Sequence, residues 1–504
     1  MSYLRVWIEL TLETTSDLHI GDGTEEVLDT RGKAERAARF GVPEASLAND
    51  EDQQKAQYAR VYHGHVRNPL KPYIPGSTLR GLLRRLAKKS PGLEFLFGSE
   101  RQADTLSASA LVVEDGVWHS SRVAITDHLP FYCSDSETYI RHATAIDPIT
   151  GAVAAGKLFS YELVPSGALF EVKLRIEAPA ALSEKLITDE HITALRQILA
   201  QLDSTSSISA LGAGTGQGMG RIKLTKMSFE LLSVAAFATW VAGPSDAKPP
   251  RTPMTFPDNF APATVATHAL TLLFVSPLMC SDPNRKKPNP SANASATDKT
   301  QLSGKPAQAF LRDANGNPII PARSLRGAAR ARARKIVATM ALQQPGMEIP
   351  RALNVADRLI DDLFGTEAKR SLVQFTDAKT AADTISKIQT QTFNAIDRFT
   401  GGVADGKLYS AEWADNPVLQ TELSFRKPLE PWQKGLLILL ARDAAEGDLA
   451  LGWGKAKGFG RFLLESKQLP KFGPGVEQKW LDAVKALEEK ITQQIKEPPA
   501  VGAN

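Results

Sequence analysis

Cysteine is scarce in this chain, and long apolar runs are absent from it. The two cysteines among 504 residues, Cys133 and Cys280, fall in different halves, so we expect no disulfide framework and a reducing compartment. No apolar segment reaches the roughly 18 residues that a membrane-spanning helix needs. The beginning, MSYLRVWIEL, lacks the pattern of a signal peptide. These absences predict a cytoplasmic protein with no membrane partner.

A strong charge of one sign is also missing, because the formal net charge is only +4. A polyanion-binding hypothesis must therefore rest on where the positive residues lie. The content of 42% hydrophobic and 23% charged residues is typical of a globular protein. Since domains usually hold about 100 to 200 residues, the length favours at least two domains, each with its own core.

A phrase of sixteen residues occurs twice in the sequence. It reads AIDPITGAVAAGKLFS at 145–160 and AIDRFTGGVADGKLYS at 395–410. A match of this length at shared spacing predicts a duplicated domain. The residues of its Asp-x-x-Thr-Gly core are Asp147 and Thr150 in the first copy and Asp397 and Thr400 in the second.

Two basic helices are the second repeated feature. Segments 76–90 (GSTLRGLLRRLAKKS) and 322–336 (ARSLRGAARARARKI) contain no acidic residue, and each follows a Pro-x-Ile-Pro sequence. Helical spacing places arginines on one stripe of each helix, and each helix start has a serine and amide groups that suit a phosphate. The alternative is a solvated surface helix with a good cap. The residues are Ser77, Arg80 and Arg84 in the first copy and Ser324, Arg326 and Arg330 in the second.

Glycine-rich segments near the end of each half form the third pair. They read LGAGTGQGMGRI at 211–222 and LGWGKAKGFGRF at 451–462. Neither contains the Gly-x-Gly-x-x-Gly of a dinucleotide fold or the Gly-Lys-Ser/Thr of a P-loop, and strands rather than long helices follow them. They predict flexible loops whose backbone can approach a ligand closely, or hairpins that merely turn the chain.

Every landmark recurs in the same order, so each half is expected to repeat one α+β plan of ferredoxin-like type. Alternating apolar residues predict an opening strand in each half, and helices are expected at 182–202 and 430–445. The linker is rich in proline and polar residues. The predicted parts are a first domain at 1–243, a linker at 244–262, a second domain at 263–470 and a helical tail at 471–504.

The three motif pairs together resemble the RAMP superfamily, and within it the backbone subunits of type III CRISPR effector complexes. The layout is similar to the fusion of two such subunits found in type III-D systems. The resemblance implies two tandem modified RRM/ferredoxin-like domains with inserted loops and thumb hairpins, acting in antiviral defence. It also implies a crRNA guide, a complementary target RNA, other RAMP subunits and a large polymerase-like subunit as partners.

The resemblance implies, through the matching motifs, that the basic helices and glycine-rich loops contact RNA. Such contacts with phosphates carry no sequence information, as expected when base pairing reads the target. The guide-binding residues would be Ser77, Arg80, Arg84, Gly218 and Arg221 in the first half and Ser324, Arg326, Arg330, Gly458 and Arg461 in the second. The repeated phrase, with Asp147, Thr150, Asp397 and Thr400, would lie beside the thumbs near the target strand.

The resemblance further implies that the subunit cuts target RNA through an acidic residue in the loop before each basic helix. In this chemistry the neighbouring 2′-hydroxyl would attack the phosphate of the target RNA. The reaction would depend on a divalent metal ion, for which Mg²⁺ is the expected candidate. Here the loops at 21–70 and 281–315 are long insertions, so spacing does not fix the carboxylate. The candidates are Asp29 and then Asp52 in the first loop, and Asp298 and then Asp282 and Asp313 in the second.

Two further hypotheses stay open. One or both long loops could have lost the cutting function, which leaves a non-catalytic RNA-binding scaffold. Alternatively, the chain could be a ribonuclease that processes the crRNA precursor, a role that relatives in the same superfamily have. That role requires a catalytic histidine near the N-terminal half of a unit, and the second repeat has only His268 in its first strand. His63 and His65, just before the first basic helix, could instead assist a proton transfer in target cleavage. A His-x-His on a loop is more often structural, and no third metal ligand is evident.

Overall fold

The computed structural model describes most of both repeats and leaves out most of the two long insertions. The described residues are 2–27, 61–68, 70–87, 93–98, 108–121, 129, 132–133, 135–147, 153–177, 186–203, 209–244, 248–255, 267–282, 309–313, 316–366, 369–381, 387–404, 409–465 and 477–496. Asp29, Asp52, Thr150 and Asp298 lie outside them. Within the described ranges, no helix is long and apolar enough to span a membrane.

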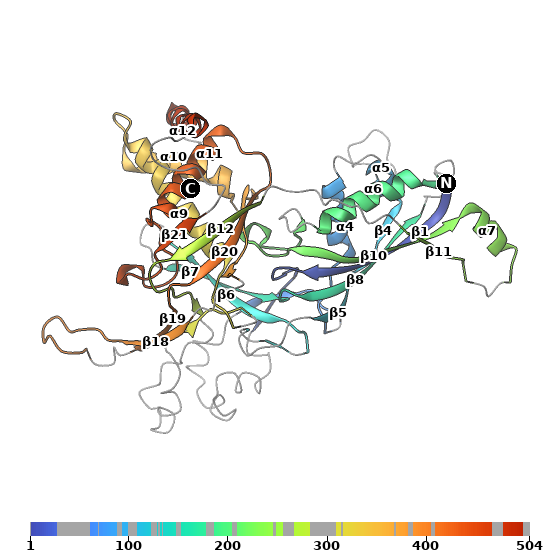
Figure 1. Ribbon diagram of the computed structural model, residues 1–504, viewed down its shortest axis with the longest axis horizontal. Coiled ribbons are helices and arrows are strands. Elements are labelled where there is room, and N and C mark those ends of the chain that lie inside the picture. The colour runs from blue at the N-terminus through green and yellow to red at the C-terminus, as the bar shows by residue number, and fades with distance from the viewer. Residues whose placement is uncertain are drawn as a thin grey trace, which may run out of the picture.

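An antiparallel sheet of seven strands forms the body of the first unit (Figure 1). Its main path runs β11-β10-β1-β8-β4, while β5 pairs with β8 and β9 pairs with β1. As the alternation predicts, Val6, Ile8 and Leu10 of the opening strand are buried. The strands are β1 (Ser2–Thr14), β4 (Leu111–Val113), β5 (Val117–Ser121), β8 (Ala168–Glu177), β9 (Ile187–Thr188), β10 (Ile222–Ser233) and β11 (Thr252–Met254).

Helices cover one face of this sheet. α4 (Gly76–Leu86) is the first basic helix, and it buries Leu79, Leu82 and Leu83 in the core. α5 (Leu93–Phe97) and α6 (Asp189–Ala200) lie beside it (Figure 1), and the turn η4 (Gln201–Asp203) follows α6. The predicted helix at 182–202 is thus present over its second part.

The second unit repeats the plan with a sheet of six strands and a larger helical layer. The sheet order is β15-β17-β20-β12-β21, and β16 pairs with β20. The strands are β12 (Thr267–Phe274), β15 (Ile319–Ile320), β16 (Val373–Phe375), β17 (Ala378–Thr380), β20 (Val418–Phe425) and β21 (Phe462–Glu465). The helices are α9 (Ala322–Leu342), α10 (Ile349–Phe364), α11 (Pro431–Ala445) and α12 (Gln478–Lys496). The predicted α+β fold is therefore confirmed in both units.

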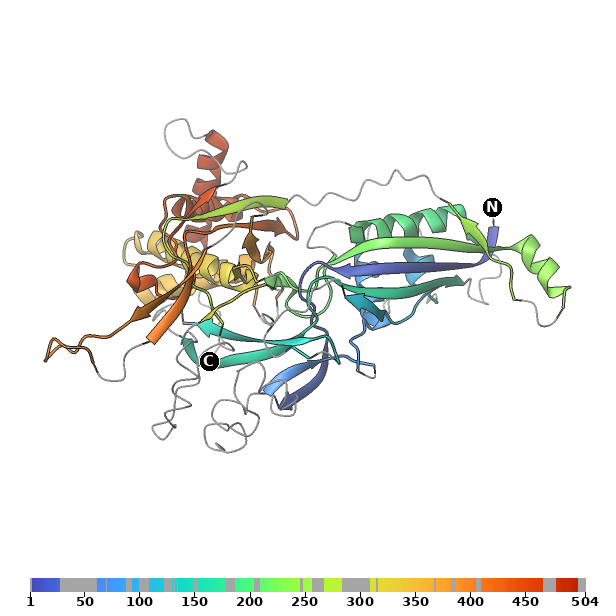
Figure 2. The ribbon, with the colours of Figure 1, turned by 60° about the horizontal axis from the view of Figure 1, so that its bottom comes forward.

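A hairpin extends from each unit. In the first unit it is part of a four-stranded sheet of order β2-β3-β7-β6, whereas in the second β18 and β19 form a two-stranded ribbon that projects from the body (Figure 2). The strands are β2 (Gly21–Val27), β3 (Val61–His65), β6 (Tyr139–Ile146), β7 (Val153–Leu163), β18 (Ile388–Phe393) and β19 (Tyr409–Ala414). A short pair, β13 (Ser281–Asp282) and β14 (Ala309–Phe310), lies near β19.

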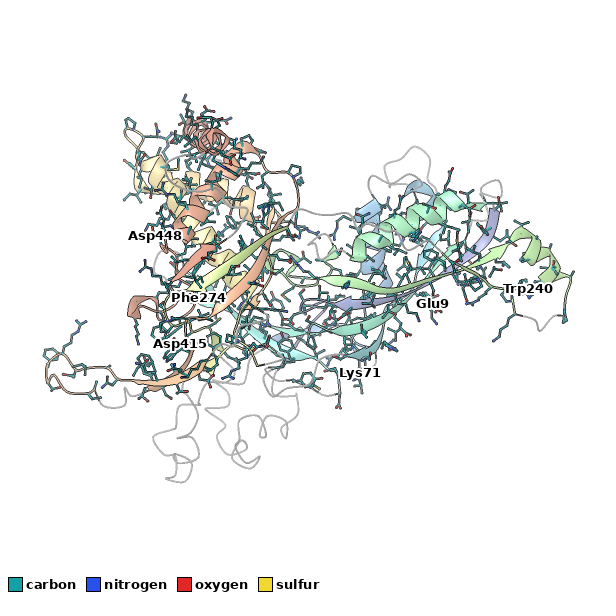
Figure 3. The ribbon with its side chains drawn as sticks, viewed as in Figure 1. Glu9, Lys71, Trp240, Phe274, Asp415 and Asp448 are labelled. Carbon is teal, nitrogen blue, oxygen red and sulfur yellow. The ribbon has the colours of Figure 1, made fainter. Side chains whose placement is uncertain are left out.

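The predicted linker and tail are both partly folded onto the units. β11 lies inside the 244–262 segment and pairs with β10, so this part of the predicted linker extends the first sheet. It follows α7 (Val234–Val241), a short apolar helix that buries none of its residues and carries Trp240, far from Phe274 of the second unit (Figure 3). In the tail, α12 buries Leu487 and Ile491 on the helices of the second unit.

Candidate nucleic-acid interface

The starts of the two basic helices are bound by carboxylates of the protein itself. The first amide of α4 donates to Asp115 Oδ1 at 2.7 Å, and the first amide of α9 donates to Asp377 Oδ1 at 2.7 Å. A carboxylate here satisfies a helix-start amide and complements the helix dipole. The amide predicted to meet a phosphate therefore has an aspartate partner in both units. Ser77 and Ser324 lie exposed on the first turns.

The arginine stripes bind the ends of the neighbouring helices. Arg80 donates to the carbonyl of Phe97, the last residue of α5, at 2.8 Å. In the second unit, Arg330 donates to the carbonyl of Gly365, just after α10, at 2.9 Å. The same role belongs to Arg84, which donates to Phe97 and Gly98, and to Arg326, which donates to Phe364. These arginines neutralise helix C-termini, and their contact with RNA stays a prediction.

Each glycine-rich loop folds as one 3-10 turn between left-handed glycines. The turns are η6 (Thr215–Gln217) and η7 (Lys455–Lys457). Gly218 and Gly458, which follow them, share a φ of 83°, a conformation that favours glycine. The backbone path therefore requires glycine at these positions in both units, whatever the loops bind.

The first loop docks onto the second unit. The carbonyl of Thr215 accepts a hydrogen bond from Gln374 Nε2 at 3.1 Å, and its hydroxyl accepts one from Arg426 Nη2 at 3.0 Å. Gln374 lies in β16 and Arg426 directly follows β20, so the edge of the second sheet holds the turn. The first loop is thus a joint between the units.

The matched glycines show that the second loop has no such neighbour in the part of the chain that the structure describes. A Cβ added at Gly218 would lie 2.5 Å from the carbonyl oxygen of Phe375 and 2.7 Å from the Cβ of Ala322, both in the second unit. At Gly458, no heavy atom of the described residues lies within 4 Å of the same position. Among the described residues, the first loop is thus covered at Gly218, whereas the second is open at Gly458.

The arginine at the end of each loop differs between the units in the same way as the glycines do. Arg221 Nη1 lies 3.3 Å from Glu422 Oε2 in the second unit, and its side chain is only 7% exposed. Burial lowers the pKa of Arg221, and Glu422 opposes this effect. The amides of Arg221 and Arg461 donate to Ser16 and Ser276, each at 2.9 Å. Arg461, however, is exposed and available to an anion.

A cavity of about 700 Å³ lies at the joint, lined by residues of both units. One of its lining residues is Arg141, whose Nη2 lies 2.7 Å from Asp17 and whose Nη1 lies 4.0 Å from Asp377. Burial opposes the charge of Arg141, but Asp17 raises its pKa, and burial raises that of Asp377. The charged lining residues are Asp17, Arg141, Arg221, Arg312, Asp313, Asp377, Lys379 and Glu422. Because the positive and negative lining residues are equal in number, the cavity suits ion pairs between the units better than it suits binding of a phosphate.

The repeated phrase forms a turn at the tip of the second hairpin. Asp397 Oδ1 accepts hydrogen bonds from the amides of Thr400 at 2.8 Å and Phe399 at 2.9 Å, which lower the pKa of Asp397. Gly401 follows with a φ of 71°. In the second copy, Asp397, Thr400 and Gly401 thus close this turn. The turn leaves Phe399 fully exposed beside the exposed Arg398.

The first hairpin lies against the second unit instead. Arg323 at the start of α9 donates to the carbonyl of His142 in β6 at 2.9 Å. Further along α9, Asp357 and, to a smaller extent, Asp147 of the first hairpin raise the pKa of Arg334. Thr150 lies outside the described residues. The two thumbs thus have unlike neighbours.

The carboxylates predicted to cut RNA are only partly described. Asp282 is completely buried in β13, where it cannot reach an RNA hydroxyl in this arrangement. Asp313 accepts a hydrogen bond from the amide of Asn317 at 2.9 Å. Among the described residues, no group of three side chains could hold a metal ion. Asp29, Asp52 and Asp298 lie outside the described residues, and their role stays a prediction.

His65 has a structural environment. Its side chain is fully buried, and its Nδ1 lies 2.9 Å from the carbonyl of Val66. Burial lowers the pKa of His65 to about 4. A neutral, buried imidazole is a poor proton carrier for RNA cleavage at neutral pH, which agrees with the structural interpretation of this histidine.

Sequence reasoning missed an aromatic cluster at the second loop. Phe393 and Tyr409 of the hairpin meet Trp453 and Phe459 of the loop around Lys457. The signal was present, because the first loop has Ala213, Gln217 and Met219 where the second has Trp453, Lys457 and Phe459. The aspartates at the helix starts were missed too.

Comparison with known families identifies both repeats. The model of the RAMP superfamily matches residues 11–223 and 271–463, which together are more than half of the chain. The two matched regions correspond to the two sheets with their helices and hairpins. A search of the curated proteins finds no match.

Proposed function

Because this chain belongs to the RAMP superfamily, which is associated with subunits of CRISPR RNA-binding complexes, we propose that it is a guide-RNA-binding backbone subunit of a type III effector complex. Its two units would bind consecutive stretches of crRNA, as in a type III-D fusion. Complementary target RNA, other RAMP subunits and the large polymerase-like subunit would be its partners. The cytoplasm is the expected location.

The observation that carries this proposal is the set of exposed groups at the second loop and hairpin. Lys455, Lys457 and Arg461 are exposed around a glycine turn, and Arg398 is exposed at the hairpin tip. Cations on such a scaffold bind phosphates without reading bases. The helix stripes, by contrast, support the proposal less, because their arginines bind helix ends.

Target cleavage is the second part of the proposal. The hydroxyl at the 2′ position would attack the adjacent phosphate in line, so the protein's task is to hold the RNA in that geometry. The hairpin turns and loops would hold the strand on either side of the cut. A divalent cation such as Mg²⁺ would stabilise the charge that develops on the phosphate. Asp29 and Asp298 are the carboxylates proposed to position it, one for each unit.

RNA binding by the full chain tests the first part. We expect fluorescence anisotropy with a labelled guide RNA to show binding that weakens steeply with salt. Arg461→Ala and Arg398→Ala should each lower the slope of log K against log salt by about 0.7, the value for one phosphate contact in single-stranded RNA. The control is Arg251→Ala, an exposed arginine directly before β11 that pairs with Glu230. Absence of salt-dependent RNA binding by the unaltered protein would exclude the proposal.

A non-catalytic scaffold is the alternative that a specific observation favours. The long insertions at 21–70 and 281–315 take the place of the usual short loops, and Asp282 is buried. This alternative predicts RNA binding without cuts. The precursor-processing ribonuclease has weaker support, because His65 is buried and His268 lies in β12 beside Phe425.

A further inference from the structure

Four aromatic rings gather where the second glycine-rich loop meets the second hairpin. The ring centroids of Phe393 and Tyr409 lie 5.5 Å apart, and that of Trp453 lies 6.3 Å from Tyr409 and 5.8 Å from Phe459. Phe393 and Trp453 pack against the hydrophobic core of the unit, and Phe459 is part of it. The hydrophobic core of the second unit therefore holds one side of the cluster in place.

Lys457 lies over this cluster. Its Nζ is 4.7 Å from the ring centroid of Trp453, 5.0 Å from that of Tyr409 and 5.2 Å from that of Phe393. It also donates to the Tyr409 hydroxyl. Lys457 is exposed, and the three rings beneath it are only half-buried. An ammonium group thus occupies the outer side of an aromatic platform that is open to solvent.

By sequence, the first unit lacks most of the residues that form this platform. Aligned on the repeated phrases, Phe393 corresponds to Ala143, Trp453 to Ala213 and Phe459 to Met219. The lysine corresponds to a glutamine, and Phe159 alone keeps an aromatic ring, in place of Tyr409. The first loop is moreover covered by the second unit. The difference between the loops is therefore one of chemistry as well as of exposure.

We propose that the platform is a nucleobase-stacking site of the second unit, with Lys457 as its exchangeable cover. A cation over aromatic rings at an exposed site contributes about two- to fivefold to an equilibrium. Stacking of an RNA base on an aromatic ring contributes about 5- to 150-fold. A base therefore displaces the ammonium, and Lys457 then joins Lys455 beside the phosphate. The inference rests on the RNA-binding function proposed above.

The competing explanation is structural. The rings could serve only to tie the loop to the hairpin, since the second loop lacks the anchor that the second unit gives to the first. Stacking needs a base on the RNA, whereas an anchor does not. A ligand that has phosphates but lacks bases separates the two explanations.

The test uses the full chain, a labelled ten-nucleotide single-stranded RNA and the same RNA with abasic residues. We expect Trp453→Ala to weaken binding of the normal RNA by about 5- to 150-fold and to leave binding of the abasic RNA unchanged. Trp453→Phe, which keeps a ring, should recover most of the affinity. Trp480→Ala is the matched control, because Lys479 lies 5.0 Å over that indole on α12, away from the loop. It should change neither affinity.

Three outcomes would overturn the inference, and they differ in their meaning. Equal affinities of Trp453→Ala and the unaltered protein for the normal RNA would show that no base stacks there, while RNA binding stands. A parallel loss for both RNAs would establish the structural anchor instead. Failure of the unaltered protein to bind either RNA would overturn the proposed function together with this inference.

Discussion

The guanidinium of Arg221 in the first unit lies 3.3 Å from the carboxylate of Glu422 in the second. Arg461, at the same place in the second repeat, is exposed instead. Replacement of Arg221 by alanine should lower the free energy of unfolding by about 1 to 3 kcal/mol, because the packing of a buried guanidinium is lost and the half-buried carboxylate of Glu422 loses its partner. Arg461→Ala should change it by less than about 0.5 kcal/mol. Urea unfolding measures both, and equal values would contradict the joint described above.

A second matched pair is formed by Gly218 and Gly458. Both have a φ of 83°, which strains an alanine backbone. Substitution by alanine at either position should therefore lower the free energy of unfolding by about 1 kcal/mol. At Gly218 the new methyl group also meets Phe375 and Ala322 across the joint, and the total should reach about 2 to 4 kcal/mol. Thermal unfolding of the two variants checks the difference. Similar losses of the free energy of unfolding in both variants would mean that the first loop can separate from the second unit at little cost.

The pH dependence of stability should contain a contribution from His65. Burial lowers its pKa from 6.5 in the unfolded chain to about 4 in the folded protein. The folded state thus prefers the neutral ring, and this stability is fully present above pH 6.5 and is lost as the pH falls towards about 4. The whole effect is about 3 kcal/mol. Urea unfolding at pH 7 and pH 5 measures how far the free energy of unfolding falls between the two pH values. This fall should be smaller in His65→Asn than in the unaltered protein, and an equal fall would show that His65 does not cause it.

Cleavage is tested with the assembled complex, a guide and complementary RNA. Asp29→Ala and Asp298→Ala should each remove one cut, with a loss of at least about 100-fold in its rate, and should leave RNA binding intact. Removal of divalent metal with a chelator should abolish both cuts. Gel mapping of the products checks this. Survival of all cuts in both variants would refute the choice of carboxylates and direct attention to Asp52 and Asp313, whereas absence of cuts in the unaltered complex would support the scaffold.

Phe399 at the second hairpin tip provides a test of the thumb. Its side chain is fully exposed, so Phe399→Ala should change the free energy of unfolding by less than about 0.5 kcal/mol. If the thumb meets the guide-target duplex, loss of the ring should weaken target binding by about 1 to 3 kcal/mol, as expected for a lost base stack. Anisotropy with labelled target RNA measures this. Val403→Ala, 55% exposed on the same hairpin, is the control that should have no effect.

The sequence predicted what depends on local pattern and repetition. Alternation predicted the opening strand, with Val6 and Ile8 buried, and the duplicated phrases predicted two units of α+β fold. It did not predict that Asp115 and Asp377 would bind the helix starts, because each follows a strand far along the chain from its helix. Pairing across such distances leaves no periodic signal.

The joint and the aromatic platform escaped prediction for the same reason. Thr215 and Arg426 are 211 positions apart, and nothing near either residue indicates the other. Phe393 and Trp453 come from a hairpin and a loop, and each by itself would be interpreted as an ordinary core residue. Only the comparison of the two repeats, position by position, could have indicated the platform, because aromatic residues replace small ones in one copy.

The joint at Thr215 has a consequence for concentration. Contacts between separate subunits weaken on dilution, whereas two units on one chain meet at an effective concentration that dilution does not change. The hydrogen bonds from Gln374 and Arg426 should therefore hold the first loop in place even when the protein is scarce in the cell. A pair of neighbouring RNA sites would then be ready before any other subunit arrives, and assembly on a guide could begin from this chain.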